Sequence, residues 1–140
     1  MSKLLARLSD PARSGVYRAS HKRDLCDALS GSGHDLAAVV LPPGKDAMLA
    51  AIATALDFPD WFGGNWDALE ECLTDLSWRK RTARVILFSR ASAGDDLGVL
   101  LDVLASAAES WRERGVAFFA VFIDPARKLA LPALYNEEAK

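Results

Sequence analysis

The chain has 140 residues, of which 51% are hydrophobic and 26% are charged, and its formal net charge is −2. These values predict a single soluble globular domain, and the near-neutral charge argues against direct nucleic-acid binding, which needs a basic stripe. No apolar run approaches the roughly 18 residues of a membrane span, and the first ten residues lack the apolar core of a signal peptide. The two cysteines, Cys26 and Cys72, are typical of reduced thiols, so we expect a cytoplasmic protein.

The N-terminal part of the chain divides into a polar segment and a strand–helix pair. We expect residues 1–13 to form a loosely held arm and residues 14–124 to form the single domain. Within that domain, residues 15–19 predict a short strand. Residues 21–30 predict a helix that the following glycines end.

The middle of the chain begins with an apolar run over residues 35–41, which predicts a strand buried on both faces. Residues 46–56 predict an alanine-rich helix with its large apolar side chains at helical spacing. A second buried strand is predicted over residues 85–88.

The C-terminal part predicts a long helix and one more buried strand. The helix covers residues 95–114, where Asp95 and Asp96 can cap its start, and Gly115 fits the position just past its end. The strand covers residues 116–123, and residues 125–140 form a C-terminal tail. Apolar strands alternating with helices predict an α/β fold with a small, mainly parallel sheet of three to four strands packed with helices.

The most informative stretch is the aromatic, glycine-broken loop that leads into a helix over residues 66–76. Asn65 is a good N-cap, and Asp67 falls in the first turn, where it meets the positive end of the helix dipole. At about 100° per residue, the helix has one apolar and one polar face. The apolar face holds Trp66, Leu69, Cys72, Leu73 and Leu76, and the polar face holds Asp67, Glu70, Glu71, Thr74 and Asp75.

This polar face has no counter-charge in the surrounding sequence. Between Lys45 and Arg79 there are seven acidic residues and no Lys or Arg, so the net charge of −2 divides into −7 in this window and +5 elsewhere. Like charges four residues apart cost a helix about 0.2–0.5 kcal/mol per pair. The face is therefore either simply solvated or a binding surface for a basic partner. The neighbouring Trp61 and Phe62 favour the second interpretation, because aromatic side chains often anchor interfaces.

The sequence gives little support for a catalytic site or for a cofactor site. Asp67 and Glu71 could act as an acid–base pair, but acids along one exposed helix face do not acquire the different pKa values that such catalysis needs. His21 and His34 are isolated, and the chain has no glycine-rich phosphate-binding motif. We therefore expect no catalysis, no cofactor and no metal.

The segment over residues 56–75 resembles the barstar family of ribonuclease inhibitors. The family's aromatic–aromatic–Gly-x-Asn-x-Asp-Ala-Leu core is matched by Trp61, Phe62, Gly63, Asn65, Asp67, Ala68 and Leu69. The order of elements from about 35 to 123 is also similar to that family. Residues 15–31 would then be an N-terminal addition.

The resemblance implies a barstar-like fold and a non-catalytic inhibitor that blocks the cationic active site of a basic, barnase-like, guanyl-preferring ribonuclease. It implies a protein partner, an antitoxin or immunity role, and a free monomer. By residue matching, Asp67 and Glu71 would reach the enzyme's phosphate-binding region, and Trp61 would stack on its catalytic histidine. The implied partner-binding residues are Trp61, Phe62, Gly63, Gly64, Asn65, Asp67, Glu70, Glu71, Thr74 and Asp75.

The chain departs from the family pattern at four of the matched positions. Glu71 stands in place of an aspartate, Glu70 in place of a tryptophan and Gly64 in place of an acid, and Ser110 falls where the last helix supplies another acidic contact. These departures leave an alternative open, in which the same acidic face binds another basic protein without inhibiting a ribonuclease.

Overall fold

The computed structural model describes residues 3–60, 62–79, 83–91 and 94–135. The elements follow the order α1 (Lys3–Leu8), η1 (Pro11–Arg13), β1 (Gly15–Ala19), α2 (Arg23–Leu29), β2 (Asp35–Val40), α3 (Lys45–Ala55), α4 (Trp66–Asp75), β3 (Arg84–Ser89), α5 (Asp95–Glu113) and β4 (Phe118–Ile123). Among the described helices, none combines the length and the apolar character needed to cross a membrane.

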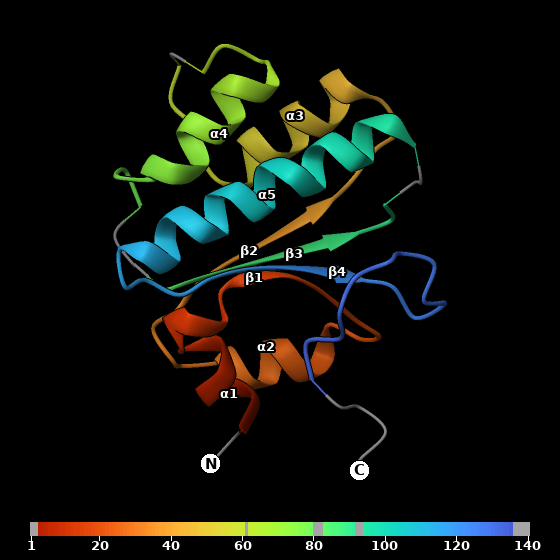
Figure 1. The fold of residues 1–140 in the computed structure, drawn as a ribbon. Helices are drawn as coiled ribbons and strands as arrows, with labels where there is room; N and C mark the ends of the chain where they lie inside the picture. The colour runs from red at the N-terminus through yellow and green to blue at the C-terminus, as the bar shows by residue number, and fades with distance from the viewer. Residues whose placement is uncertain (1–2, 61, 80–82, 92–93, 136–140) are drawn as a thin grey trace.

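The four strands form one parallel sheet in the order β1-β4-β3-β2 (Figure 1). This arrangement confirms the predicted α/β class. Strand β1 pairs with β4 along its whole length, from Gly15 beside Phe119 to Ala19 beside Ile123. The strand expected to be an addition is thus an integral edge of the sheet.

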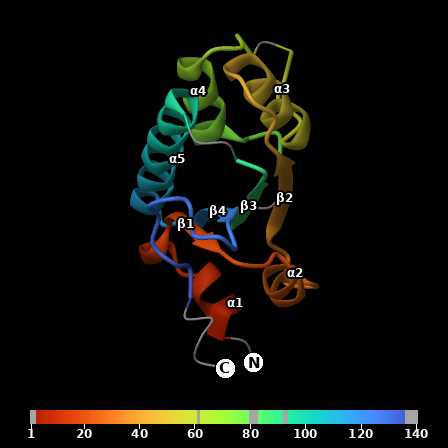
Figure 2. The ribbon, with the colours of Figure 1, turned by 90° about the vertical axis from the view of Figure 1, so that its right-hand side faces the viewer.

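Helices cover both faces of the sheet. Figures 1 and 2 show α1 and α2 on one face and α3, α4 and α5 on the other. The connection from β1 to β2 runs across the whole sheet in one direction, and the connections from β2 to β3 and from β3 to β4 run back. Right-handed crossovers that run in opposite directions place their helices on opposite faces, which explains the division.

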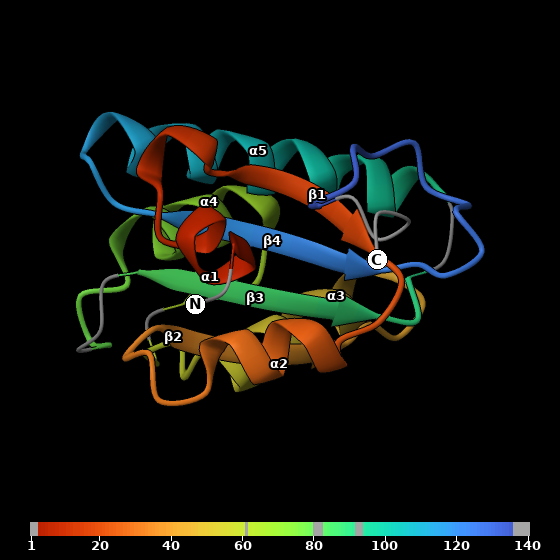
Figure 3. The same ribbon diagram turned by 90° about the horizontal axis from the view of Figure 1, so that it is seen from below.

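Each face has its own apolar core. The larger core lies under α3, α4 and α5 and contains the stacked rings of Phe88 and Phe122, whose centroids are 4.7 Å apart. The smaller core lies under α1 and α2, which Figure 3 shows in front of the sheet. It includes Leu4, with 9% of its surface exposed, and the fully buried Leu8. The expectation of a loosely held arm is therefore wrong for residues 3–13.

Part of the C-terminal tail is also held against the sheet. The amide of Arg18 donates a hydrogen bond to the Pro132 carbonyl, and the amide of Leu134 donates one to the Arg18 carbonyl, each at 2.9 Å. Leu134 is fully buried in the smaller core. Residues 132–134 thus cover the outer edge of β1.

The burial of strand β2 differs from the expectation drawn from the sequence. Its residues alternate between buried and exposed, and Val40 has 61% of its surface exposed. The prediction of a strand buried on both faces is wrong, because β2 is an edge strand that is fully covered only on the side of α3. The central strands β3 and β4 are buried at all but their last residues, as predicted.

The predicted helix ends agree with the structure to within about two residues, with one correction. Gly94, and not Asp95 or Asp96, is the N-cap of α5, and both aspartates lie in its first turn. Gly115 has a φ of 75° and follows the C-cap residue Arg114, as predicted. Glycine suits this left-handed conformation because it has no Cβ to clash.

A buried ion cluster connects Arg79, which follows α4, and Arg84, which begins β3, to Asp35. Asp35 at the start of β2 accepts hydrogen bonds from Arg79 at 2.6 Å and from Arg84 at 2.8 Å. Burial alone would raise the pKa of Asp35, but the hydrogen bond and charge of Arg79 and the charge of Arg84 outweigh it, so the pKa is lowered. Arg84 also donates to the carbonyl of Leu76, which ties the cluster to the end of α4.

Candidate functional site

Helix α4 begins at the residue that the sequence predicts. The Oδ1 atom of Asn65 accepts a hydrogen bond of 2.7 Å from the amide of Ala68, and the Asn65 backbone is extended, as in an N-cap. Asp67 lies in the first turn and is exposed. The cap fixes where the helix starts, and therefore which residues share each of its faces.

The inner face of α4 is an apolar anchor. Leu69, Cys72, Leu73 and Leu76 have no exposed surface, and the half-buried Trp66 packs against the same core. This is the apolar face that the sequence predicts. Because the inner face is fixed by packing against the larger core, the rotation of α4 about its axis is fixed as well.

The C-terminal end of α4 is held by two side chains of the α5 region. The indole Nε1 of Trp111 donates to the Leu73 carbonyl at 2.7 Å, and Arg114 donates to the Thr74 carbonyl at 2.6 Å. These carbonyls belong to the last turn, where a helix has no internal donors left. Leu76 then ends the helix in a left-handed conformation with a φ of 49°.

The outer face of α4 carries the acidic residues singled out by the sequence. Asp67, Glu70, Glu71 and Asp75 are all exposed, and none forms an ion pair with any residue that the structure describes. Arg114 is the nearby cation of α5, but it donates to a carbonyl and to Ser110 rather than to a carboxylate. The four acids define a surface that we call the α4 acidic face.

Thr74 lies beside the α4 acidic face and is half-buried. Its hydroxyl lies 2.9 Å from the Glu70 carbonyl and 3.2 Å from the Glu71 carbonyl of its own helix. Such bonds back to the preceding turn are common for threonine within helices.

The loop before α4 differs in part from expectation. Trp61 lies outside the described residues. Phe62 is half-buried rather than freely exposed, because its ring packs edge-on against Phe58 with centroids 4.9 Å apart and touches the larger core. Gly63 and Gly64 are exposed. Gly64 has a φ of 72°, a backbone conformation that residues with a side chain rarely adopt.

The sequence reasoning missed Arg114. Its guanidinium lies 3.7 Å from the centroid of the Trp111 ring and donates to Ser110 Oγ at 3.0 Å, so it is fixed between α5 and the end of α4. A tryptophan followed by an arginine three positions later on a helix is a detectable signal for such stacking. Ser110, which stands where the last helix of the family supplies another acidic contact, serves here as the acceptor for Arg114.

The chemistry of the site offers little for catalysis. Burial raises the pKa of the Cys72 thiol, and the nearby charges of Asp75 and Glu71 raise it further, which disfavours the reactive thiolate. Within the described ranges, no three His, Cys, Asp or Glu residues gather in a way that could hold a metal ion.

A comparison with known families gives a match. The family model described as barstar (barnase inhibitor) matches residues 42–123, which is more than half of the chain. The chain belongs to the barstar family. A comparison with curated proteins gave no match.

The barstar match begins just after β2 and ends with β4, and it contains α3, α4, β3, α5 and β4. It therefore includes the whole α4 acidic face and the helix end that supports it. The barstar family is a family of inhibitors that bind a ribonuclease. The elements before residue 42, namely α1, η1, β1, α2 and β2, lie outside the matched region.

Proposed function

We propose that this chain is a stoichiometric protein inhibitor of a basic, barnase-like, guanyl-preferring ribonuclease. In this proposal the α4 acidic face and the loop over residues 61–65 block the active site of the enzyme. The partner-binding residues are those implied by the family resemblance: Trp61, Phe62, Gly63, Gly64, Asn65, Asp67, Glu70, Glu71, Thr74 and Asp75.

The observation that supports this proposal most is the exposure of four acids on one rigid helix without an ion-pair partner among the described residues. Unneutralised carboxylates repel each other, so they lower the stability of a free helix. The active site of a ribonuclease has to bind phosphates and is therefore rich in cations. Docking such a site on α4 would replace the repulsion with opposite-charge contacts and would accelerate association.

The support of α4 by α5 favours the same proposal. The bonds from Trp111 and Arg114 immobilise the last turn of α4 before any partner arrives. An interface that is already rigid loses less conformational entropy on binding, so more of the contact energy contributes to affinity. Asp67 and Glu71, one turn apart on this rigid helix, would be the two principal contacts.

A titration of the chain against a barnase-like ribonuclease tests the proposal. At low salt and micromolar concentration, we expect activity to fall linearly with added protein and to reach zero at one inhibitor per enzyme. A parallel calorimetric titration should give the same one-to-one stoichiometry. Absence of both inhibition and heat would exclude this class of enzyme as the target.

The second candidate function is a non-inhibitory module that binds another basic protein through the α4 acidic face. The departures at Glu70, Glu71, Gly64 and Ser110 favour this alternative, because they change the shape and charge of the surface from the family pattern. Capture of partners from the native cell distinguishes the two functions. The inhibitor proposal requires a ribonuclease among the captured proteins that loses activity on binding, whereas the alternative requires a basic partner without that effect.

A further inference from the structure

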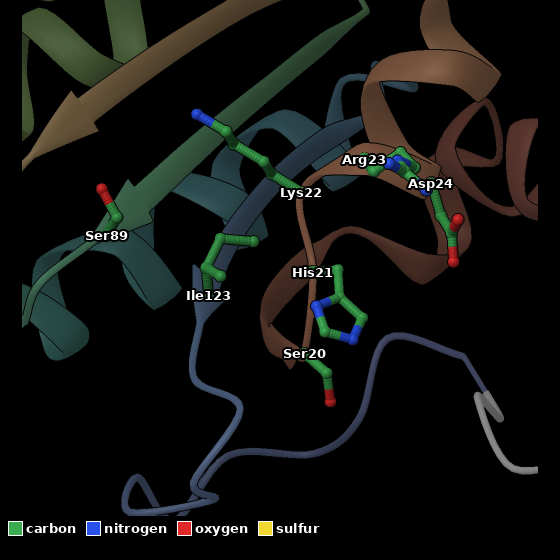
Figure 4. Close-up of a pocket in the computed structure, with 7 residues that line it drawn as sticks. All are labelled: Ser20, His21, Lys22, Arg23, Asp24, Ser89 and Ile123. Atoms are coloured by element: carbon green, nitrogen blue, oxygen red, sulfur yellow. The ribbon is translucent and has the colours of Figure 1, made fainter.

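A pocket lies at the edge of the sheet where the parallel strands end, away from the α4 acidic face. It has a volume of about 630 Å³. It is lined by residues 20–22 of the β1–α2 connection, by Arg23 and Asp24 at the start of α2, and by Ser89 and Ile123 (Figure 4). The strand register explains this grouping, because Ala19 pairs with Ile123 in β4, and Phe88, which precedes Ser89, pairs with Phe122. The ends of β1, β4 and β3 therefore lie at one level.

The topology opens a crevice at this point. The chain leaves β1 toward α2 on one face of the sheet, whereas it leaves β3 toward α5 on the other face (Figure 2). Strand β4 lies between them, so the segments on its two sides diverge above its carboxyl end. In open parallel sheets, this divergence is the position at which small ligands bind. The volume also lies within the range of about 300–1,000 Å³ that is usual for such sites.

The polar lining contains two cationic side chains, those of Lys22 and Arg23, and one acidic side chain, that of Asp24. His21, Lys22 and Arg23 are exposed, and none of them forms an ion pair with a described residue. Figure 4 shows the Lys22 side chain extending over the strands and the His21 side chain extending in another direction from the same segment. Asp24 is the acid of the lining, and its carboxylate accepts a hydrogen bond of 2.7 Å from the Tyr135 hydroxyl.

The pocket also has hydroxyl groups and an apolar side chain that could contact a ligand. Ser20 and Ser89 provide hydroxyl groups at the rim, and Ile123 provides an apolar wall. Hydroxyls and cationic side chains together bind phosphate oxygens, and an apolar wall accommodates an organic group. The pocket is many times larger than the roughly 30 Å³ occupied by a water molecule, so a bare anion would not fill it.

From this combination we propose that the pocket binds a nucleotide-sized phosphate ester, with its phosphate at Lys22 and Arg23 and its organic group against Ile123. The site is independent of the inhibitor function, since α2 and α4 lie on opposite faces of the sheet (Figure 1). A ligand here would thus leave the α4 acidic face open to its protein partner.

The test uses the full chain labelled with ¹⁵N and two-dimensional amide NMR spectra. ADP is titrated to about 5 mM, which detects dissociation constants in the millimolar range. We expect saturable shifts of the amides of residues 20–24, Ser89 and Ile123, with those of α4 unchanged. Adenosine should bind at least about tenfold more weakly than ADP, because it lacks the charge that the cations recognise.

Charge reversals at the pocket provide the second measurement. Lys22→Glu and Arg23→Glu should each weaken ADP binding at least about fivefold. The matched control is Lys45→Glu, an equally exposed lysine on the other face of the sheet, which should leave the affinity unchanged. All three side chains are exposed, so the variants should fold, and their spectra verify this directly.

Three results would overturn the proposal. The first is the absence of saturable shifts at the pocket with ADP. The second is equal binding of ADP and adenosine, or equal effects of Lys22→Glu and Lys45→Glu. The third is binding of a single-stranded RNA oligonucleotide at these residues with no response to ADP, which would identify a surface for nucleic acid instead.

Discussion

The indole nitrogen of Trp111 lies 2.7 Å from the carbonyl oxygen of Leu73, so a side chain of α5 completes the last turn of α4. The Trp111 ring also lies between two guanidinium groups, with Arg114 at 3.7 Å and Arg84 at 5.3 Å from its centroid. One residue thereby connects the acidic helix to the buried ion cluster beneath it. Its contacts hold the end of α4, and therefore the α4 acidic face, in place.

Replacing Trp111 tests how much its hydrogen bond to Leu73 contributes to the stability of the protein. We expect Trp111→Phe to lower the free energy of unfolding by about 2 kcal/mol, because it leaves the buried Leu73 carbonyl without its donor. Urea unfolding followed by circular dichroism provides the value. The control is Trp66→Phe, since the half-buried Trp66 indole has no hydrogen bond to a residue that the structure describes. Equal losses in the two variants would show that ring volume, not the hydrogen bond, is what matters.

The start of α4 provides a second stability test. Asn65→Ala removes the acceptor for the Ala68 amide and should cost about 1 kcal/mol of unfolding free energy. Asn65→Asp keeps an acceptor at the same position and should retain most of the stability. If the alanine variant unfolded at the same urea concentration as the unchanged protein, the cap would contribute nothing.

The buried Asp35 predicts a specific dependence on pH. Its pKa is lowered in the folded protein by Arg79 and Arg84 despite the opposing effect of burial, whereas unfolded aspartate titrates near 3.9. The resulting stability is therefore complete above the unfolded pKa and is lost as the pH falls through the lower, folded pKa. Asp35→Asn should cost about 3 kcal/mol at pH 7, because it leaves Arg84 buried without its counter-charge.

The cost of Asp35→Asn should shrink as the pH is lowered from 5 toward 2, as measured by urea unfolding at each pH. Asp57→Asn serves as the matched control, because Asp57 also bonds Arg79 but its side chain is 81% exposed. That variant should lose no more than about 1 kcal/mol at any pH. A loss for Asp35→Asn that does not vary with pH would contradict the assigned role of the carboxylate.

The proposed binding surface predicts the effect of one charge reversal. Glu71→Lys should weaken the complex with the basic partner at least about tenfold and should make its affinity less sensitive to salt. Isothermal titration at two salt concentrations measures both effects. Asp27→Lys, at an exposed position of α2 on the opposite face of the sheet, should leave binding unchanged. Equal effects of the two reversals would indicate a response to net charge alone.

The local chemistry of α4 could be predicted from the sequence because it depends on spacing within one helix. Asn65 caps the helix, Leu69 and Leu73 are buried, and Glu70 and Glu71 are exposed, all as the 3.6-residue period requires. Long apolar runs likewise predicted the central strands β3 and β4. Each of these features is determined by residues that are close in the chain.

The burial of Phe62 could not be predicted in this way. Phe62 lies in a loop, where no periodic pattern shows which side it faces, and its burial depends on Phe58 and the core beneath it. The sequence of strand β2 predicts full burial, because apolar composition does not distinguish a central strand from an edge strand. The polar sequence over residues 3–13 does not show that Leu4 and Leu8 pack into the smaller core, because that contact is made with elements distant in the chain.

The sequence by itself determined the α/β class, the family resemblance and the separation of acidic from apolar residues on α4, since these follow from composition and period. Only the tertiary structure decided the strand order, the bonds from Trp111 and Arg114 to the end of α4, and the pocket beyond β1, β3 and β4. The physical reason is that these features join residues distant in the chain. Such contacts form only when the whole sheet and its helices are packed together.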